Sequence, residues 1–396
     1  MALEQVFVPY GAYWSSPFCR WQGSLGEQNA IEIAARTAAA ALRARGVAPE
    51  VLDSLILGYT VPQKHSFYGA PWLAGMLGAP GISGAMVGQA CATSARVIAS
   101  AALEVELGQR ECVLGICCDR TSNGPHIYYP NPGGIGGMGE VEHPVWDNFN
   151  LDPWAGQAMI ETAERLAREA GISREEQDAV TVRRYEQYAE ALADDRAFQR
   201  RYMVPVEIGK GKKARAVEAD EGVHPTNAEG LARLKPVLPD GTVTFGSQTH
   251  PADGNAGMVI CSRERARQLS RDAKLEVRLI GYGEARLEKG RMPAATVPAA
   301  RQALERAGVK LEDCGVIKSH NPFAVNDVYF ARETGADLQA MNPHGSPLIY
   351  GHPQGPTGLR VVIEMIEALA EAGGGHGLFT GCAAGDTAMA LVVRVG

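Results

Sequence analysis

Cys91 lies at a position in the sequence where its thiol could be reactive. It lies in GAMVGQACATSARVIASAAL, in which a strand-like run leads through small residues into a predicted helix. The positive end of a helix dipole favours the thiolate, which is the nucleophilic form of cysteine. Cys91 is therefore a candidate nucleophile. A buried structural cysteine at a tight turn is the alternative, and this feature alone leaves both open.

Two further residues could handle protons. His352 lies in GHPQGPTGLR, also just before a predicted helix, among glycines that allow close backbone approach. Cys382 follows the strand-like GLFT in the segment GCAAGD. A histidine can take the proton of a thiol, and a second thiol can act as an acid or base. A histidine bound by neighbouring backbone groups and a cysteine packed in the core are the alternatives.

The elements that would position these residues occur twice. Three pairs of segments match in the same order: 46–61 with 308–320, 94–108 with 358–373 in the register Arg96–Arg360, and 257–262 with 387–395. The first match sets Gly46 against Gly308, and the second sets Cys118 against Cys382. Helices alternate with short apolar strands in both copies, which predicts an α/β fold of two halves related by a pseudo-twofold axis.

The halves differ by an insertion. We assign residues 1–120 plus 243–270 to the first half, 271–396 to the second, and 121–242 to an inserted loop domain that covers the substrate. Capping boxes predict helices that open at Ser24–Glu27 and, inside the insertion, at Ser173–Glu176. The insertion also holds a group of aromatic residues that could line a pocket or form its packing core: Tyr128, Tyr129, Trp146, Phe149 and Trp154.

Together these segments resemble the thiolase family over nearly the whole chain. Thiolases have a nucleophilic cysteine before a long helix, a GHPxGxxG histidine and a second cysteine in a glycine-rich turn, and Cys91, His352 and Cys382 occupy those places in order. The stretch DEGVHPTNAEGLARLKPV (220–237) is similar to the family's D-E-x-P…L-x-x-L-x-P segment. The resemblance implies a thiolase fold, with the two α/β halves in five layers (αβαβα) and a loop domain.

The resemblance also implies roles. Cys91 would be acylated, His352 would take its proton, and Cys382 would act as acid or base on the second substrate. His320, in HNPF, stands where many thiolases have an asparagine and is similar to the histidine of sterol-carrier-type thiolases; it would help to build an oxyanion site. The remaining residues that the resemblance places at the oxyanion site or the substrate are Ala384, Phe323, Met159 and Thr249.

Coenzyme A and acyl-CoA are the implied substrates, with no bound cofactor and no metal. The basic run KGKKAR, with Lys210, Lys212 and Lys213, could meet the phosphates of coenzyme A, or could be a solvated turn. The resemblance implies a homodimer or tetramer. The Ala-rich helix at 30–42 and the strand CVLGICC are predicted to be buried, which fits such an assembly.

The implied reaction is acyl transfer between coenzyme A and a 3-ketoacyl-CoA, in the direction of cleavage or of condensation. One alternative is a ketoacyl synthase, which uses Cys–His–His; Cys382 argues against it, although His320 leaves room for it. Another is a thiolase-like subunit that needs a small zinc-ribbon/OB-fold partner to cleave a bulky or aromatic 3-ketoacyl-CoA.

Composition narrows the class of protein further. The net charge of -7 argues against a nucleic-acid partner, since phosphate binding favours a basic surplus. The sequence has no apolar run long enough for a membrane span and no signal-peptide pattern. Its eight cysteines are scattered without a CxxC pair, which indicates reduced thiols and a cytoplasmic location.

Overall fold

The computed structural model describes residues 2–209 and 211–396. Within them, β1 (Phe7–Val8) pairs with a strand of each half and so joins both halves in one mixed sheet. The strand order is β13-β14-β15-β12-β1-β11-β6-β4-β5. The first half contributes β4 (Ser54–Gly58), β5 (Ser83–Val87), β6 (Cys112–Arg120) and β11 (Ala252–Cys261); the second contributes β12 (Val277–Arg286), β13 (Cys314–His320), β14 (Gly375–Ala383) and β15 (Thr387–Val395).

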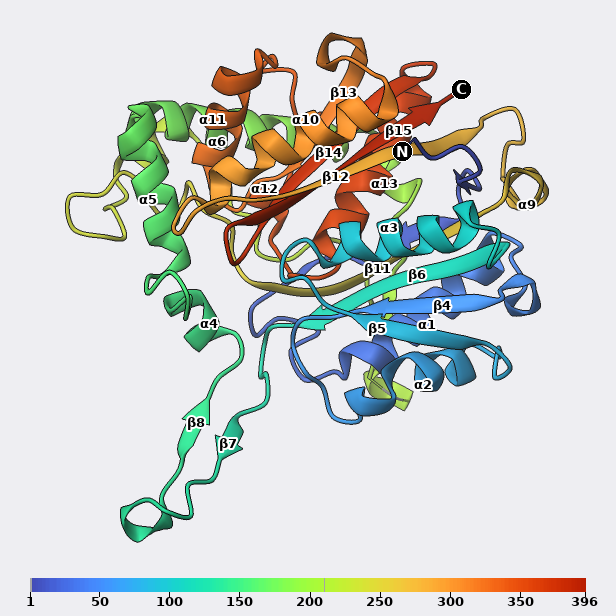
Figure 1. The fold of residues 1–396 in the computed structure, drawn as a ribbon, viewed down its shortest axis with the longest axis horizontal. Coiled ribbons are helices and arrows are strands. Elements are labelled where there is room, and N and C mark those ends of the chain that lie inside the picture. The colour runs from blue at the N-terminus through green and yellow to red at the C-terminus, as the bar shows by residue number, and fades with distance from the viewer. Residues whose placement is uncertain (1, 210) are drawn as a thin grey trace.

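Helices cover both outer faces and also fill the middle (Figure 1). In the first half α1 (Ala30–Ala44) and α2 (Gly69–Met76) pack on the outer face, and in the second α10 (Thr296–Ala307) and α11 (Ala324–Thr334) do so. Between the halves lie α3 (Thr93–Glu106) and α13 (Thr357–Glu371), which contact each other. The five layers predicted from the sequence are confirmed, and the matched segments occupy equivalent places in them.

The insertion runs around the two halves. It holds the arm β7 (Ile127–Tyr129) and β8 (Glu140–Glu142), then α4 (Trp146–Asn150), α5 (Met159–Ala170) and α6 (Arg174–Ala191), and then the hairpin β9 (Val206–Ile208) and β10 (Arg215–Val217). The arm projects from the body below α4 (Figure 1). Helices α5 and α6 pack on α11, which attaches this part of the insertion to the second half.

One predicted capping box is present and the other is wrong. The Ser173 hydroxyl accepts a hydrogen bond from the Glu176 N–H at 3.2 Å and caps α6. The first helix instead begins at Ala30, and its cap is Asn29. Ser24 donates its hydroxyl to Glu221 of the insertion. A partner distant in the sequence therefore takes the hydroxyl that local spacing assigned to a helix end.

Burial also corrects two interpretations. The helix α1 packs against α2, β6 and β11, and β6 lies between β11 and β4, so their apolar residues are covered within one chain and say nothing about an oligomer. Of the aromatic residues in the insertion, Phe149 lines a cavity, whereas Tyr128, Tyr129, Trp146 and Trp154 are exposed. In the part of the chain that is described, no helix has the length and apolar character of a membrane span.

Candidate active site

The two central helices bring the candidate loops together. The hydroxyl of Ser94, in the first turn of α3, donates to the carbonyl of Gly355, just before α13. A Cβ atom on Gly358 would lie only 3.0 Å from the Ser94 Cβ, so glycine permits this close approach of the two helix ends. Cys91 and His352 precede these ends and therefore meet.

Cys91 sits in a strained turn. The preceding Ala90 has φ 44°, a left-handed conformation that a residue with a side chain adopts at some cost. The thiol is buried, and this burial raises its pKa to about 11, although hydrogen bonding to the backbone of Ala384 and of Cys91 itself works in the opposite direction. The expected helix-end stabilisation of the thiolate is thus outweighed by desolvation, and the resting form is the thiol.

His320 and His352 face each other across the same site. Their ring centroids are 4.2 Å apart at an angle of 35°. One ring nitrogen of each histidine and the Cys91 sulfur all lie within 4.8 Å of one another. These are residue types that could also hold a zinc ion. The Nδ1 atom of His352 is 2.7 Å from the Thr357 hydroxyl, whereas Nε2 has no hydrogen-bond partner among the described residues and is free to accept the proton of the thiol.

Both imidazoles are neutral at pH 7. Burial lowers the pKa of His320 to about 3, and burial together with the neighbouring His320 lowers the pKa of His352 well below its usual value. Neither ring nitrogen of His320 has a hydrogen-bond partner within the described residues. The adjacent Asn321 is turned away, because its amide donates to Asp327 at 2.7 Å and accepts from the Leu348 N–H at 3.3 Å.

Cys382 lies at the end of β14, next to the histidine strand. The amide of Asn326 donates to its sulfur at 3.2 Å. Burial is the main cause that raises the pKa of the Cys382 thiol, and the nearby Cys91 raises it further. Since β13 and β14 run parallel with His320 opposite Gly381, the sheet itself brings Cys382 beside His320.

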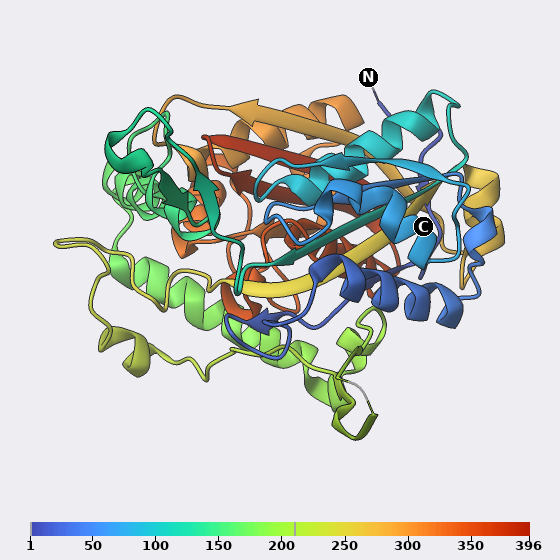
Figure 2. The same cartoon turned by 90° about the horizontal axis from the view of Figure 1, so that it is seen from below.

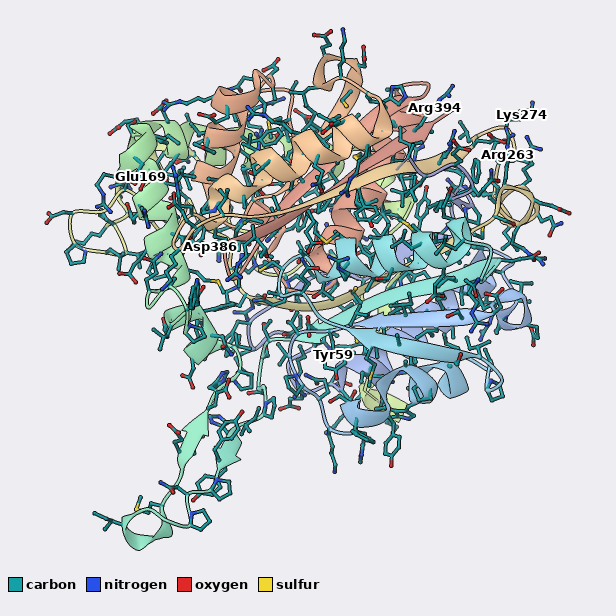
Figure 3. The ribbon with its side chains drawn as sticks, in the orientation of Figure 1. Tyr59, Glu169, Arg263, Lys274, Asp386 and Arg394 are labelled. Atoms are coloured by element: carbon teal, nitrogen blue, oxygen red, sulfur yellow. The ribbon has the colours of Figure 1, made fainter. Side chains whose placement is uncertain are left out.

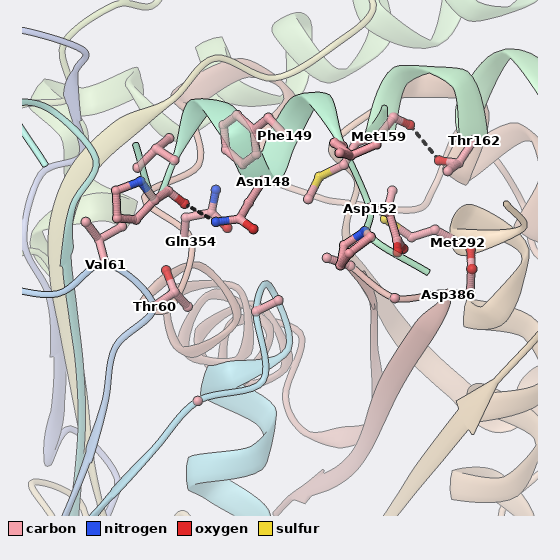
Figure 4. Close-up of a pocket in the computed structure, with 18 of the residues that line it drawn as sticks. Thr60, Val61, Asn148, Phe149, Asp152, Met159, Thr162, Met292, Gln354 and Asp386 are labelled. Atoms are coloured by element: carbon pink, nitrogen blue, oxygen red, sulfur yellow. Dashed lines mark hydrogen bonds between the residues drawn. The ribbon is translucent and has the colours of Figure 1, made fainter. Parts of the chain in front are cut away.

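A cavity of about 520 Å³ adjoins the site. Thr60, Val61 and Gln354 lie on one side of it, and Met159 and Met292 on the other (Figure 4). The other residues of its wall come from α4 and its neighbours and from the loops that carry the cysteines: Tyr59, Gly88, Ala90, Pro144, Val145, Asn148, Phe149, Leu151, Asp152, Pro153, Gln157, Thr162, Ala384, Gly385 and Asp386.

The structure brings only some of the predicted residues to this cavity. Ala384 and Met159 line it. Thr249 does not, and its hydroxyl donates to the Pro347 carbonyl at 2.6 Å. Phe323 is buried at the start of α11 and is also absent from the wall. Cys91, His320, His352 and Cys382 are not part of the wall either, although their neighbours Ala90, Gln354 and Ala384 are, so the substrate-side places of Thr249 and Phe323 stay predictions.

The basic run lies elsewhere. Lys210 falls outside the described residues. Lys212 and Lys213 are exposed in the turn between β9 and β10, a hairpin that packs on α1, away from α4 and α5 (Figure 2). Neither of them lines the cavity. Tyr59 of the first half and Asp386 of the second half do line it. Arg263, Lys274 and Arg394 lie at the opposite end of the molecule (Figure 3).

Known proteins share both the sequence and this architecture. Residues 13–264 match the thiolase N-terminal domain and residues 273–395 match the thiolase C-terminal domain. The chain belongs to the thiolase family. The human mitochondrial 3-ketoacyl-CoA thiolase is 29% identical, with 99% of this chain and 98% of that protein aligned. The beta-ketoadipyl-CoA thiolase of Pseudomonas knackmussii is 30% identical, with 96% of each aligned.

Solved thiolase structures agree along the whole chain. The crystal structure of the human mitochondrial 3-ketoacyl-CoA thiolase in complex with CoA superposes with a TM-score of 0.92 at 27% identity, covering 100% of this chain and 99% of that one. The Bacillus anthracis acetyl-CoA acetyltransferase gives a TM-score of 0.92 at 28% identity, with 100% of each covered. The predicted family, the fold and the enzyme class, acyl-CoA C-acyltransferase, are therefore confirmed.

Sequence reasoning missed two residues that hold this thiolase site together. Asp119, at the end of β6, accepts hydrogen bonds from the N–H groups of Thr60 at 2.9 Å, Val61 at 2.8 Å and Gly355 at 2.8 Å. It thereby fixes one wall of the cavity to the histidine loop, while burial raises its pKa to about 7. Asn326 is the second residue that was missed. An acidic residue at the end of an apolar strand is a sequence feature that could have indicated Asp119, whereas no sequence feature indicated Asn326.

The insertion is anchored through a buried ion pair. The Arg360 guanidinium on α13 contacts Asp220 at 2.6 and 2.8 Å and Glu364 at 3.0 Å, and it stacks 3.8 Å from the Tyr350 ring. Asp220 opens the stretch that resembles the family's D-E-x-P segment. This segment therefore contacts the helix that follows His352.

Proposed function

We propose that this thiolase transfers an acyl group between coenzyme A and a 3-ketoacyl-CoA through an acyl-Cys91 intermediate. The observation that supports it most is the convergence of a buried thiol, an imidazole nitrogen without a hydrogen-bond partner among the described residues, and a second thiol, all carried by loops that line one cavity. A nucleophile with an adjacent base is the arrangement that covalent acyl transfer needs. Coenzyme A acts as a substrate and is not a resident cofactor.

In the first step the Cys91 proton moves to His352 Nε2. The neutral imidazole can accept it, and the Thr357 hydroxyl holds the ring while it does so. In condensation the sulfur then attacks the thioester carbonyl of an acyl-CoA, and the proton leaves with the departing coenzyme A thiol. In cleavage the sulfur attacks the 3-keto carbonyl, the bond between the α- and β-carbons breaks, and the acyl group stays on Cys91 while an acyl-CoA carbanion departs. Backbone N–H groups near the sulfur, including that of Ala384, would stabilise the developing oxyanion together with a ring N–H of His320.

In the second step Cys382 exchanges a proton with the incoming substrate. In cleavage it gives its proton to the α-carbon carbanion that departs, and its thiolate then takes the proton of the incoming coenzyme A thiol. In condensation it takes a proton from the α-carbon of the second acyl-CoA. Burial disfavours its thiolate, whereas the Asn326 amide donor favours it. The presence of this second thiol favours a thiolase over a ketoacyl synthase.

A homo-oligomer is part of the proposal. Strand β5 forms the edge of the sheet next to β4, and four of its five residues are exposed. An open edge with exposed backbone groups is a place where a second copy can pair. Light scattering at micromolar concentration should report at least a dimer, and only a 42.2 kDa species would contradict this.

The experiment that tests the function uses the purified chain alone. Supplied with a 3-ketoacyl-CoA and coenzyme A, it should consume free thiol and release two acyl-CoA products. Short, branched and aromatic substrates compared in parallel would identify the acyl class. Lack of turnover on all of them, with a folded protein, would contradict the proposal and would point to a missing partner subunit.

A further inference from the structure

Gln354 touches the proposed nucleophile. Its side-chain Oε1 lies 3.5 Å from Cys91 Sγ, so the thiol donates a hydrogen bond to the carboxamide. The side chain is only 6% exposed, and it lines the 520 Å³ cavity. Among the described side chains, it is Gln354 that hydrogen-bonds this sulfur.

The backbone holds Gln354 in a strained conformation. Its φ is 62°, in the left-handed region that side-chain-bearing residues seldom adopt. The next peptide is fixed on both sides, because the Gly355 N–H donates to Asp119 at 2.8 Å and the Gly355 carbonyl accepts from Ser94. In addition, the Thr357 N–H donates to the Gln354 carbonyl at 3.3 Å. Strain that the surroundings maintain in this way gathers at functional sites, and here it turns the carboxamide toward the sulfur.

We propose that Gln354 is a catalytic residue whose carboxamide hydrogen-bonds the Cys91 sulfur in both of its protonation states. In the resting enzyme Oε1 accepts from the S–H group. When the proton has moved to His352 Nε2, the carboxamide turns about its terminal torsion, which is soft, and its Nε2–H group donates to the thiolate. No oxidation or reduction takes place. The proton leaves with the departing coenzyme A thiol in condensation, and returns from His352 to Cys91 when the acyl group passes to coenzyme A in cleavage.

The two hydrogen bonds differ in strength, and this difference determines whether Gln354 raises or lowers the pKa of Cys91. A bond donated to a charged thiolate is stronger than one accepted from a neutral thiol. The carboxamide therefore favours the thiolate on balance and offsets part of the desolvation that raises the pKa of Cys91. The inference rests on the proposed function only in taking Cys91 as the nucleophile.

The test measures how the alkylation of Cys91 by iodoacetamide depends on pH. Cys314 is the one cysteine that is not fully buried within the described residues, so Cys314→Ser serves as the background and leaves Cys91 beside the cavity as the reactive thiol. Gln354→Leu removes the amide. Gln354→Gly removes it as well, and a glycine adopts the left-handed backbone without strain, so this variant should fold. Gln157→Leu is the matched control, since Gln157 lines the same cavity and, among the described contacts, makes no hydrogen bond to the sulfur.

For both Gln354 variants we expect the alkylation profile to move upward by about one pH unit, so that alkylation at a given pH is about tenfold slower, the scale of one charge-assisted hydrogen bond. Wider access that admits water to the sulfur would lower the pKa of Cys91 and move the profile downward, which is the opposite direction. The Gln157→Leu profile should match that of the background. Unshifted profiles in both Gln354 variants would overturn the inference while leaving acylation at Cys91 intact; absence of acylation at Cys91 in the unsubstituted chain would overturn the proposed function as well.

Discussion

The first turns of α3 and α13 occupy equivalent points of the repeat, yet they carry different chemistry. In the register that sets Arg96 against Arg360, Thr93 matches Thr357 and Cys91 matches Gly355. A side chain at Gly355 would meet the Asp119 carboxylate at 2.7 Å, so only one half can place a functional side chain there. The first half supplies the nucleophile at this point, and the second half supplies its histidine three residues earlier.

The matched arginines differ in the same way. Arg96 is partly exposed and pairs with Glu284 on the surface. Arg360 is fully buried and pairs with Asp220 and Glu364. Both halves of the repeat therefore have an arginine at this position. Only Arg360 forms a buried ion pair, because the insertion supplies Asp220 as its partner.

Breaking the buried pair should have the largest effect. Arg360→Met leaves Asp220 uncompensated and should lower the free energy of unfolding by about 3–5 kcal/mol. Arg96→Met removes a surface pair and should lower it by about 1 kcal/mol or less. Urea unfolding of both variants checks the difference. Equal losses of unfolding free energy would show that the two arginines contribute equally to stability and would contradict this contrast.

His320 provides the next contrast, because the register that sets Gly46 against Gly308 places Gly58 opposite it. A Cβ at Gly58 would lie 2.6 Å from the Cys117 sulfur, so the first half has no room for a side chain there. If His320 donates to the oxyanion, His320→Ala should cost about 2.7–4 kcal/mol of transition-state stabilisation in turnover, with little change in substrate binding. His320→Asn should recover part of it. Near-normal turnover of the alanine variant would make His320 a packing residue.

The matched cysteines should separate function from packing. Cys382→Ala should lower turnover about 10²-fold or more, because it removes an acid/base group. Cys118, its counterpart, lies within the sheet opposite Asn255 and far from any proposed step, so Cys118→Ala should keep nearly full turnover. Steady-state kinetics of the two variants measures this. Similar losses in both would refute the role given to Cys382.

The smallest effect concerns acid stability. The pKa of His320 is about 3 in the folded chain, below the usual value of 6.5, so the unfolded chain binds a proton that the folded chain refuses. Stability should therefore be unaffected above pH 6.5 and should fall as the pH drops toward 3, by up to about 1.4 kcal/mol per pH unit for this group. In urea unfolding between pH 7 and 5, His320→Asn should reduce the slope of the unfolding free energy against pH by an amount that grows toward one bound proton near pH 5. An unchanged slope would contradict the neutral, buried ring.

The repeat and the motifs were enough to predict the layers and the meeting of Cys91, His352 and Cys382, because helix ends and strand ends have fixed places in such a fold. Contacts that join distant segments were not predictable in the same way. Ser24 hydrogen-bonds to Glu221 and does not cap a helix. The pKa of the Cys91 thiol is set mainly by burial and not by the helix end.

Gln354 shows the same limit. The sequence places it inside the histidine motif, but its left-handed backbone and its contact with the sulfur depend on Asp119 and Ser94, which belong to other elements. Periodicity and spacing cannot report such three-dimensional constraints. The substrate-side positions of Thr249 and Phe323 come from the motif alone and stay predictions.

Acylation is the most direct test of the central claim. The purified chain is incubated with an acyl-CoA, quenched in acid, digested and examined by mass spectrometry, with Cys91→Ala treated in parallel. The account predicts one added acyl mass on the peptide that contains Cys91 and none in the variant. An acyl group on another residue, or full thiolysis by Cys91→Ala, would contradict it.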